Sequence, residues 1–216
     1  MKNNNVKRLV MNALFFGSIW GIVEATLGYV LNLSTLGISG CIMFPIGFYV
    51  LQKTYKKNNH LSIILYSSFA AAAIKLVNLF MPISHPVKVI NPAFAIVLEG
   101  LSVMVLVSWS VKKNREIGFI SAFLAGLSWR LIYFIDVVIL YCIDIPSRMI
   151  EKGPKEYLWN FLILNSLINA VIIMLMTKAE KSGKTIDIPV SKIQPVTVVC
   201  SLLIAIGAQI FFSLIK

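Results

Sequence analysis

The sequence predicts an all-α fold, a polytopic transmembrane helix bundle of about seven spans that forms a single integral membrane domain over residues 1–216. Three observations predict it. Hydrophobic residues make up 58% of the chain and charged residues 13%, whereas soluble domains carry about 25% charged residues. The apolar residues form runs close to the ~20 residues that cross a bilayer. The basic residues fall in short tracts between these runs.

Seven apolar segments follow one another along the chain, at residues 9–31, 36–52, 61–82, 92–111, 117–143, 158–177 and 193–215. The first follows a polar, basic start and is too long for a cleaved signal peptide, so we expect a spanning helix. The second is the shortest and contains Pro45 and several glycines. It is either a kinked span or a re-entrant hairpin, so six spans is the alternative. The fourth is predicted to begin at Asn91-Pro92, because proline suits the first turn of a helix.

The basic residues orient the spans. With a cytoplasmic N-terminus, most Lys and Arg residues outside the spans fall on the cytoplasmic side, as the positive-inside rule requires. These residues are Lys2, Lys7, Arg8, Lys53, Lys56, Lys57, Lys112, Lys113, Arg115, Lys178, Lys181, Lys184 and Lys192. The outer segments hold only Lys88, Arg148, Lys152, Lys155 and Lys216. We therefore predict a multi-pass protein of the cell (plasma) membrane with its C-terminus outside.

Five ionisable residues interrupt the apolar segments: Glu24, Lys75, Glu99, Arg130 and Asp136. A charge at the bilayer centre costs roughly 2.5–3.5 kcal/mol, so it is tolerated mainly when it is paired, hydrated or functional. All except Arg130 stand seven residues from the predicted outer end of their span, and Arg130 lies deeper. At a rise of ~1.5 Å per residue, the four residues other than Arg130 share a level about 10 Å below the outer surface.

We therefore predict a polar site in the outer half of the bundle. The candidate substrate-binding residues are Glu24, Lys75, Asn78, Glu99, Arg130, Asp136 and Asn165. The alternative is a set of buried ion pairs that only fix helix packing, with Glu99 opposite Lys75 and Arg130 opposite Glu24 or Asp136.

The sequence contains no motif that is typical of other kinds of functional site. His60 and His85 fall in loops on opposite sides of the membrane, outside any HExxH or Cys/His cluster, so we expect no metal site. No serine-hydrolase or phosphate-binding motif occurs, and we assign no catalytic residue and no cofactor. The positive-inside rule accounts for the net charge of +11, so no nucleic-acid partner is expected.

Three stretches carry a resemblance: the small-residue first helix (Gly17 to Gly21), the Gly/Pro-rich second segment (Gly40 to Gly47), and Asn91-Pro92 running to Glu99-Gly100. They resemble the membrane-embedded substrate-binding (S) component of energy-coupling factor (ECF) vitamin transporters. The resemblance implies a helical bundle that binds a vitamin-like molecule near its outer face. It also implies docking through the first helix onto a transmembrane coupling subunit driven by ATPases. That family usually has six helices with both ends cytoplasmic, whereas this sequence predicts seven.

The favoured hypothesis is a protein that binds a small polar solute near the outer face and takes part in its uptake, with separate energising subunits. Its partners would be the solute, membrane lipid, and a coupling subunit with ATPases. Two alternatives stay open. One is an integral membrane enzyme acting on a lipid or polyprenyl substrate, in which a buried glutamate serves as general acid or base. The other is a proton-coupled carrier that uses the same residues.

Overall fold

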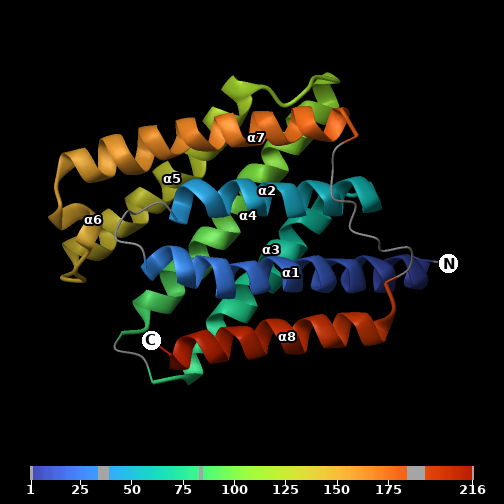
Figure 1. The fold of residues 1–216 in the computed structure, drawn as a ribbon, viewed down its shortest axis with the longest axis horizontal. Coiled ribbons are helices and arrows are strands. Elements are labelled where there is room, and N and C mark those ends of the chain that lie inside the picture. The colour runs from blue at the N-terminus through green and yellow to red at the C-terminus, as the bar shows by residue number, and fades with distance from the viewer. Residues whose placement is uncertain (1, 34–38, 83–84, 184–192, 216) are drawn as a thin grey trace.

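The computed structural model describes residues 2–33, 39–82, 85–183 and 193–215, and every regular element in these ranges is helical. In chain order they are α1 (Lys2–Leu33), α2 (Ser39–Asn58), α3 (Ser62–Leu76), η1 (Val77–Phe80), α4 (Val87–Lys113), α5 (Phe119–Cys142), α6 (Arg148–Glu151), η2 (Lys155–Leu164), α7 (Asn165–Lys181) and α8 (Pro195–Leu214). Here η1 is a 3₁₀ turn and η2 is a π-helix continuous with α7. The predicted all-α bundle is confirmed (Figure 1).

Within the described ranges, six helical stretches are long and apolar enough to cross a membrane: Val6–Leu31, Ser62–Phe80, Val87–Lys113, Phe119–Cys142, Lys155–Lys181 and Pro195–Leu214. Each overlaps one of the segments predicted from the sequence. The chain is therefore a multi-pass membrane protein.

The second predicted segment forms α2, a helix that is less apolar because other helices enclose it. It contacts α1, α3, α4 and α7. From Cys41 to Gln52 its side chains are buried except at Ile42, Ile46 and Tyr49. Because lipid reaches little of this helix, selection for apolar residues acts on few of its positions, and three lysines are tolerated in its last turns. The part of this predicted segment at 36–38 lies outside the described residues.

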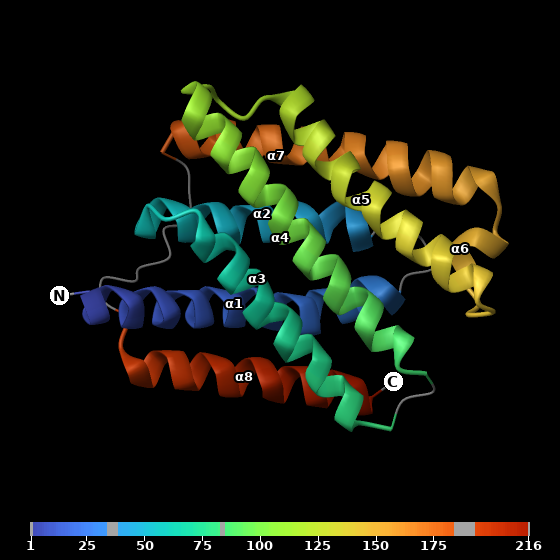
Figure 2. The ribbon, with the colours of Figure 1, turned by 180° about the vertical axis from the view of Figure 1, so that it is seen from behind.

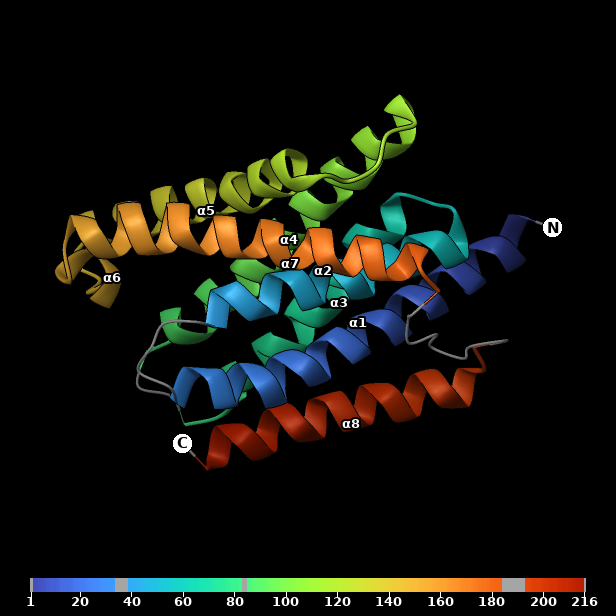
Figure 3. The same cartoon turned by 45° about the horizontal axis from the view of Figure 1, so that its top comes forward.

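The helices form two layers that cross obliquely (Figure 2). In one layer α8, α1, α2 and α7 lie side by side, and in the other α3, α4 and α5 run diagonally across them. Successive long helices run in opposite directions, so the two termini lie at opposite ends of the bundle (Figure 3). We call the end that carries α6 and the C-terminus the outer end, following the predicted orientation.

The opposite end gathers basic tracts that are far apart in the sequence. Lys53 and Lys56 of α2 pair with Glu180 of α7, with N–O distances of 3.1 and 2.6 Å. Lys181 pairs with Glu116 in the connection between α4 and α5. The sequence assigned all of these lysines to the cytoplasmic side. Among the basic residues assigned to either side of the membrane, the side chains of Lys2, Lys184, Lys192 and Lys216 lie outside the described residues.

The fourth helix begins earlier than predicted. It starts at Val87, with Pro86 at the preceding cap position, so Pro92 lies inside α4 rather than at its first turn. A proline there removes one hydrogen bond, the bond that its N–H would donate four residues back. The loss falls in the second turn, where the chain continues as a helix for a further 21 residues to Lys113.

Glycines let α1 approach α3 closely. A Cβ on Gly17 would lie 2.6 Å from both the backbone oxygen of Ser67 and the Cβ of Ala70, and a Cβ on Gly21 would lie 2.9 Å from Ile74. Such small-residue contacts are a common way for membrane helices to pack. Helix α3 therefore covers the glycine face of α1, which is the face that the resemblance assigns to docking.

We expect fusions after Ser182 and after Leu214 to report opposite sides of the membrane, because α8 crosses between them. Green fluorescent protein should fluoresce after Ser182 and alkaline phosphatase should be active after Leu214. A second pair tests α2, with phosphatase activity expected after Leu33 and fluorescence after Asn58. Phosphatase activity at both positions that flank α2 would show that this helix does not cross.

Gly17→Ala should lower the melting temperature of the detergent-purified protein, because overpacking of this kind costs about 1–3 kcal/mol. Gly207→Ala on α8 is the matched control, since a Cβ there meets no atom within 4 Å. Alanine has the higher helix propensity, so this control should be neutral or slightly stabilising. Equal melting temperatures for the two variants would contradict the close approach of α1 and α3.

Candidate functional site

Electrostatic interactions link four of the five charged residues that were predicted to share a site. Lys75 of α3 interacts with Glu24 of α1, Glu24 with Glu99 of α4, and Glu99 with Arg130 of α5. We call these four residues the charge row. In this series of interactions the two cations stand at the ends, and the two carboxylates interact with each other. The row therefore differs from the simple pairs considered from the sequence, because Glu24 lies between Lys75 and Glu99.

Glu99 is the most enclosed carboxylate of the row. Its side chain is 6% exposed, and its Oε2 has no hydrogen-bond partner within the described chain. A buried acceptor without a donor costs about 1–3 kcal/mol, and more when it is charged. This atom therefore favours a state in which a donor from outside the protein reaches it.

Arg130 is fully buried and engaged by the protein itself. Nη2 donates to the backbone oxygen of Gly40 at 2.8 Å and to Oδ1 of Asn169 at 2.6 Å. Nη1 donates to the oxygen of Gly126 at 2.9 Å and reaches Oγ of Ser166 at 3.5 Å. These acceptors are uncharged, and they tie α5 to α2 and α7. Only Nε has no partner in the described chain.

Aromatic rings surround the guanidinium of Arg130. Its central carbon lies 4.5 Å from the ring centroid of Trp129, 5.9 Å from that of Phe44 and 5.8 Å from that of Phe161. Cation–π contacts strengthen when water is excluded, so they offset part of the cost of burying this charge. They also hold the guanidinium in place beside Glu99.

Amide side chains of α7 form hydrogen bonds to α2 close to Pro45. Pro45 has no N–H, so the oxygen of Cys41 four residues earlier loses its helical donor. Asn169 supplies one, with Nδ2 at 2.6 Å from the Cys41 oxygen. Asn165 adds a second tie, since its Oδ1 accepts the thiol of Cys41 at 2.7 Å. The Oδ1 atom of Asn165, a predicted substrate-binding residue, is therefore bound to the protein itself.

The remaining predicted residues lie apart from Arg130. Asn78 is in η1, and its Oδ1 is buried with no partner in the described chain. Asp136 is half-buried on α5, where Tyr133 is the group shown to interact with it electrostatically. Sequence reasoning missed Gln209 of α8, which is 3% exposed with an unpartnered Oε1. A lone amide in an apolar segment was the signal that could have found it.

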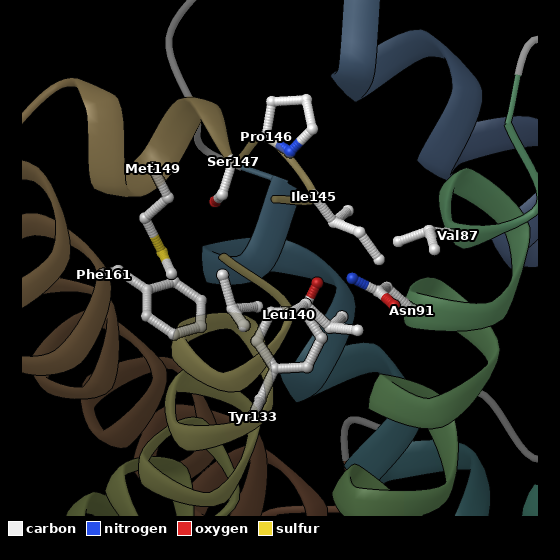
Figure 4. A pocket seen from close by; sticks show the side chains of 10 residues that line it. Val87, Asn91, Tyr133, Leu140, Ile145, Pro146, Ser147, Met149 and Phe161 are labelled. Atoms are coloured by element: carbon white, nitrogen blue, oxygen red, sulfur yellow. The ribbon is translucent and has the colours of Figure 1, made fainter. Parts of the chain in front are cut away.

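A cavity of about 280 Å³ opens near the outer end, between α4, α5, α6 and η2 (Figure 4). None of the predicted site residues lines it. Apolar and aromatic side chains form most of its wall, with three neutral polar residues among them. Its lining residues are Val87, Asn91, Tyr133, Val137, Leu140, Ile145, Pro146, Ser147, Met149 and Phe161.

The π-helix η2 forms one wall of this cavity. Its wider turns occur in proteins mainly as short segments, often at functional sites. Here it carries Phe161 into contact with Trp129 and Tyr133, with ring centroids 6.2 and 5.9 Å apart. Since Phe161 also contacts Arg130, a single layer of rings separates the cavity from the charge row.

Asn169→Leu should lower the melting temperature markedly, because it leaves the Cys41 oxygen without a donor and removes an acceptor from Arg130. Each such buried group costs about 1–3 kcal/mol. Pro45→Ala introduces an N–H four residues after Cys41, so it should restore part of the loss in the Asn169→Leu background. Asn160→Leu, which removes a bond to Glu156 at 2.9 Å, is the control. Strictly additive effects of the two substitutions would refute the proline–asparagine coupling.

Comparisons with known proteins find no relative that shares this arrangement. No protein-family model matches the chain, and no curated protein or solved structure matches it either. The functional assignment of the charge row and the cavity therefore depends on their geometry.

Proposed function

We propose that this protein binds a small polar solute in the outer half of its bundle and takes part in uptake of that solute across the cell membrane. The observation that carries the proposal is the buried charge row with its open acceptor, Glu99 Oε2. Ionisable residues inside a membrane are costly, and they commonly mark substrate or ion pathways. If the charge row served packing alone, we would expect the protein to supply a hydrogen-bond donor to each buried carboxylate oxygen in it.

The open groups indicate what the solute offers. Arg130 donates to four protein acceptors and Lys75 interacts with Glu24, so the cations of the row are engaged. The buried unpartnered atoms of the described residues include acceptors and donors, and Glu99 Oε2 is the carboxylate oxygen among them. A solute that presents an N–H donor to Glu99, most effectively on a cationic amine, matches this acceptor, because charge-assisted hydrogen bonds are the stronger ones.

Energy for uptake comes from other subunits in this proposal. The ECF resemblance implies a transmembrane coupling subunit and ATPases, and the sequence carries no phosphate-binding motif of its own. Since α3 covers the glycine face of α1, the coupling subunit docks on another face of the bundle. Its co-purification with this chain from the parent membrane would support the proposal.

A proton-coupled carrier is the second candidate, and the electrostatic interaction between the carboxylates of Glu24 and Glu99 favours it. Two carboxylates that share a site tend to hold a proton between them. Uptake that collapses when the proton gradient is dissipated, with ATP still present, would select this carrier over a subunit of an ATP-driven complex.

Glu99→Gln should remove the bound solute, because the amide keeps the shape of the side chain and loses its charge. Loss of one charged hydrogen bond corresponds to about a tenfold to hundredfold fall in affinity. Native mass spectrometry of the gently purified protein measures the occupancy. Glu151→Gln, at an exposed position outside the spans, is the matched control and should keep the solute. Equal occupancy in both variants would remove the basis of the proposal.

A further inference from the structure

The cavity near the outer end presents three neutral polar groups that the protein leaves open. The amide of Asn91 and the hydroxyls of Tyr133 and Ser147 line it, and none of them bonds to another residue in the described chain. Figure 4 shows the Asn91 amide and the Tyr133 hydroxyl directed into the same part of the cavity. They come from α4 and α5, two long helices that hold them in fixed positions.

The rest of the cavity favours a flat, apolar body. Tyr133 and Phe161 supply aromatic walls, and Trp129 holds both rings from behind at 6.3 and 6.2 Å between centroids. Aromatic rings prefer offset-stacked or edge-to-face neighbours, so a ring placed here finds partners already in position. Its volume of about 280 Å³ is near the lower limit of the ~300–1,000 Å³ typical of small-molecule pockets, which suits one or two rings.

No Lys, Arg, Asp or Glu lines this cavity. A charged ligand would give up its water here without a lining residue of opposite charge, which is costly. For a cation, Asp136 offsets part of that cost through its electrostatic interaction with Tyr133. An uncharged ring that carries a hydrogen-bonding group loses little and meets Asn91, Tyr133 and Ser147. The chemistry of the wall therefore selects against ions of the same size and shape.

We infer that this cavity is a binding site for an uncharged, planar ring compound with an amide-like hydrogen-bonding group. The site deepens the proposed function, on which it rests, by naming a neutral ring compound as the class of solute. Phe161, which lines the cavity and also contacts Arg130, lies between this site and the charge row.

Three probes of matched shape test the charge preference: benzamide, benzoate and benzamidinium. Saturation-transfer NMR with the purified protein in detergent measures the binding of each. The variant Ser147→Trp fills the cavity with a side chain from the segment that connects α5 to α6. The difference in signal between the wild type and this variant measures binding at the site, because partition into micelles is the same for both. We expect this site-specific signal for benzamide to exceed those of both ions by at least about fivefold. An equal or larger signal for either ion would overturn the inference, as would the absence of such a signal for all three probes.

Tyr133→Phe keeps the ring and removes the hydroxyl, so benzamide should bind about threefold to tenfold more weakly, the worth of one neutral hydrogen bond. Tyr141→Phe, at an exposed position on the same helix, should bind it as the wild type does. Unchanged binding by Tyr133→Phe contradicts the role of the hydroxyl. Glu99→Gln should leave benzamide binding intact. A result that refutes ligand binding in this cavity is therefore different from a result that refutes solute binding at the charge row.

Discussion

The structure depends on the hydrogen bonds that join Arg130 and Asn169 to the backbone of α2. Pro45 leaves an oxygen of α2 open, Asn169 of α7 binds it, and the same asparagine accepts from Arg130 of α5. Since water is absent at this depth, each group must find its partner in the protein. Three helices from different parts of the chain are thereby fixed in register, and the aromatic rings around the guanidinium are fixed with them.

These hydrogen bonds also determine which charged groups of the row can bind a ligand. Because the NH groups of Arg130 point to backbone and amide oxygens, the arginine offers Glu99 a nearby charge without giving it a hydrogen bond. A buried carboxylate in that situation has a cation nearby and still lacks a hydrogen-bond donor. Binding sites need this combination, since a group already satisfied by the protein has little to gain from a ligand.

The sequence was sufficient for the helical spans and insufficient for the partners of the charged residues within them. Apolar run length and basic tracts depend on the bilayer, which acts on each helix separately. The partner of Cys41 depends on how α7 lies against α2, 128 residues away in sequence, and no local pattern contains that. The start of α4 was placed too late because Pro92 was given the role that Pro86 has. The cavity escaped notice because loop residues and neutral side chains form much of it.

The pairing of α1 with α8 places a condition on how the protein is made. Helix α1 packs beside α8, which is made much later, and the ring centroids of Tyr29 of α1 and Phe212 of α8 lie 5.1 Å apart. Until α8 is synthesised, the flank of α1 that packs against it faces lipid or a chaperone. The bundle therefore closes only after α8 has been made, and a chain that stops short of α8 lacks the helix that completes the packing of α1.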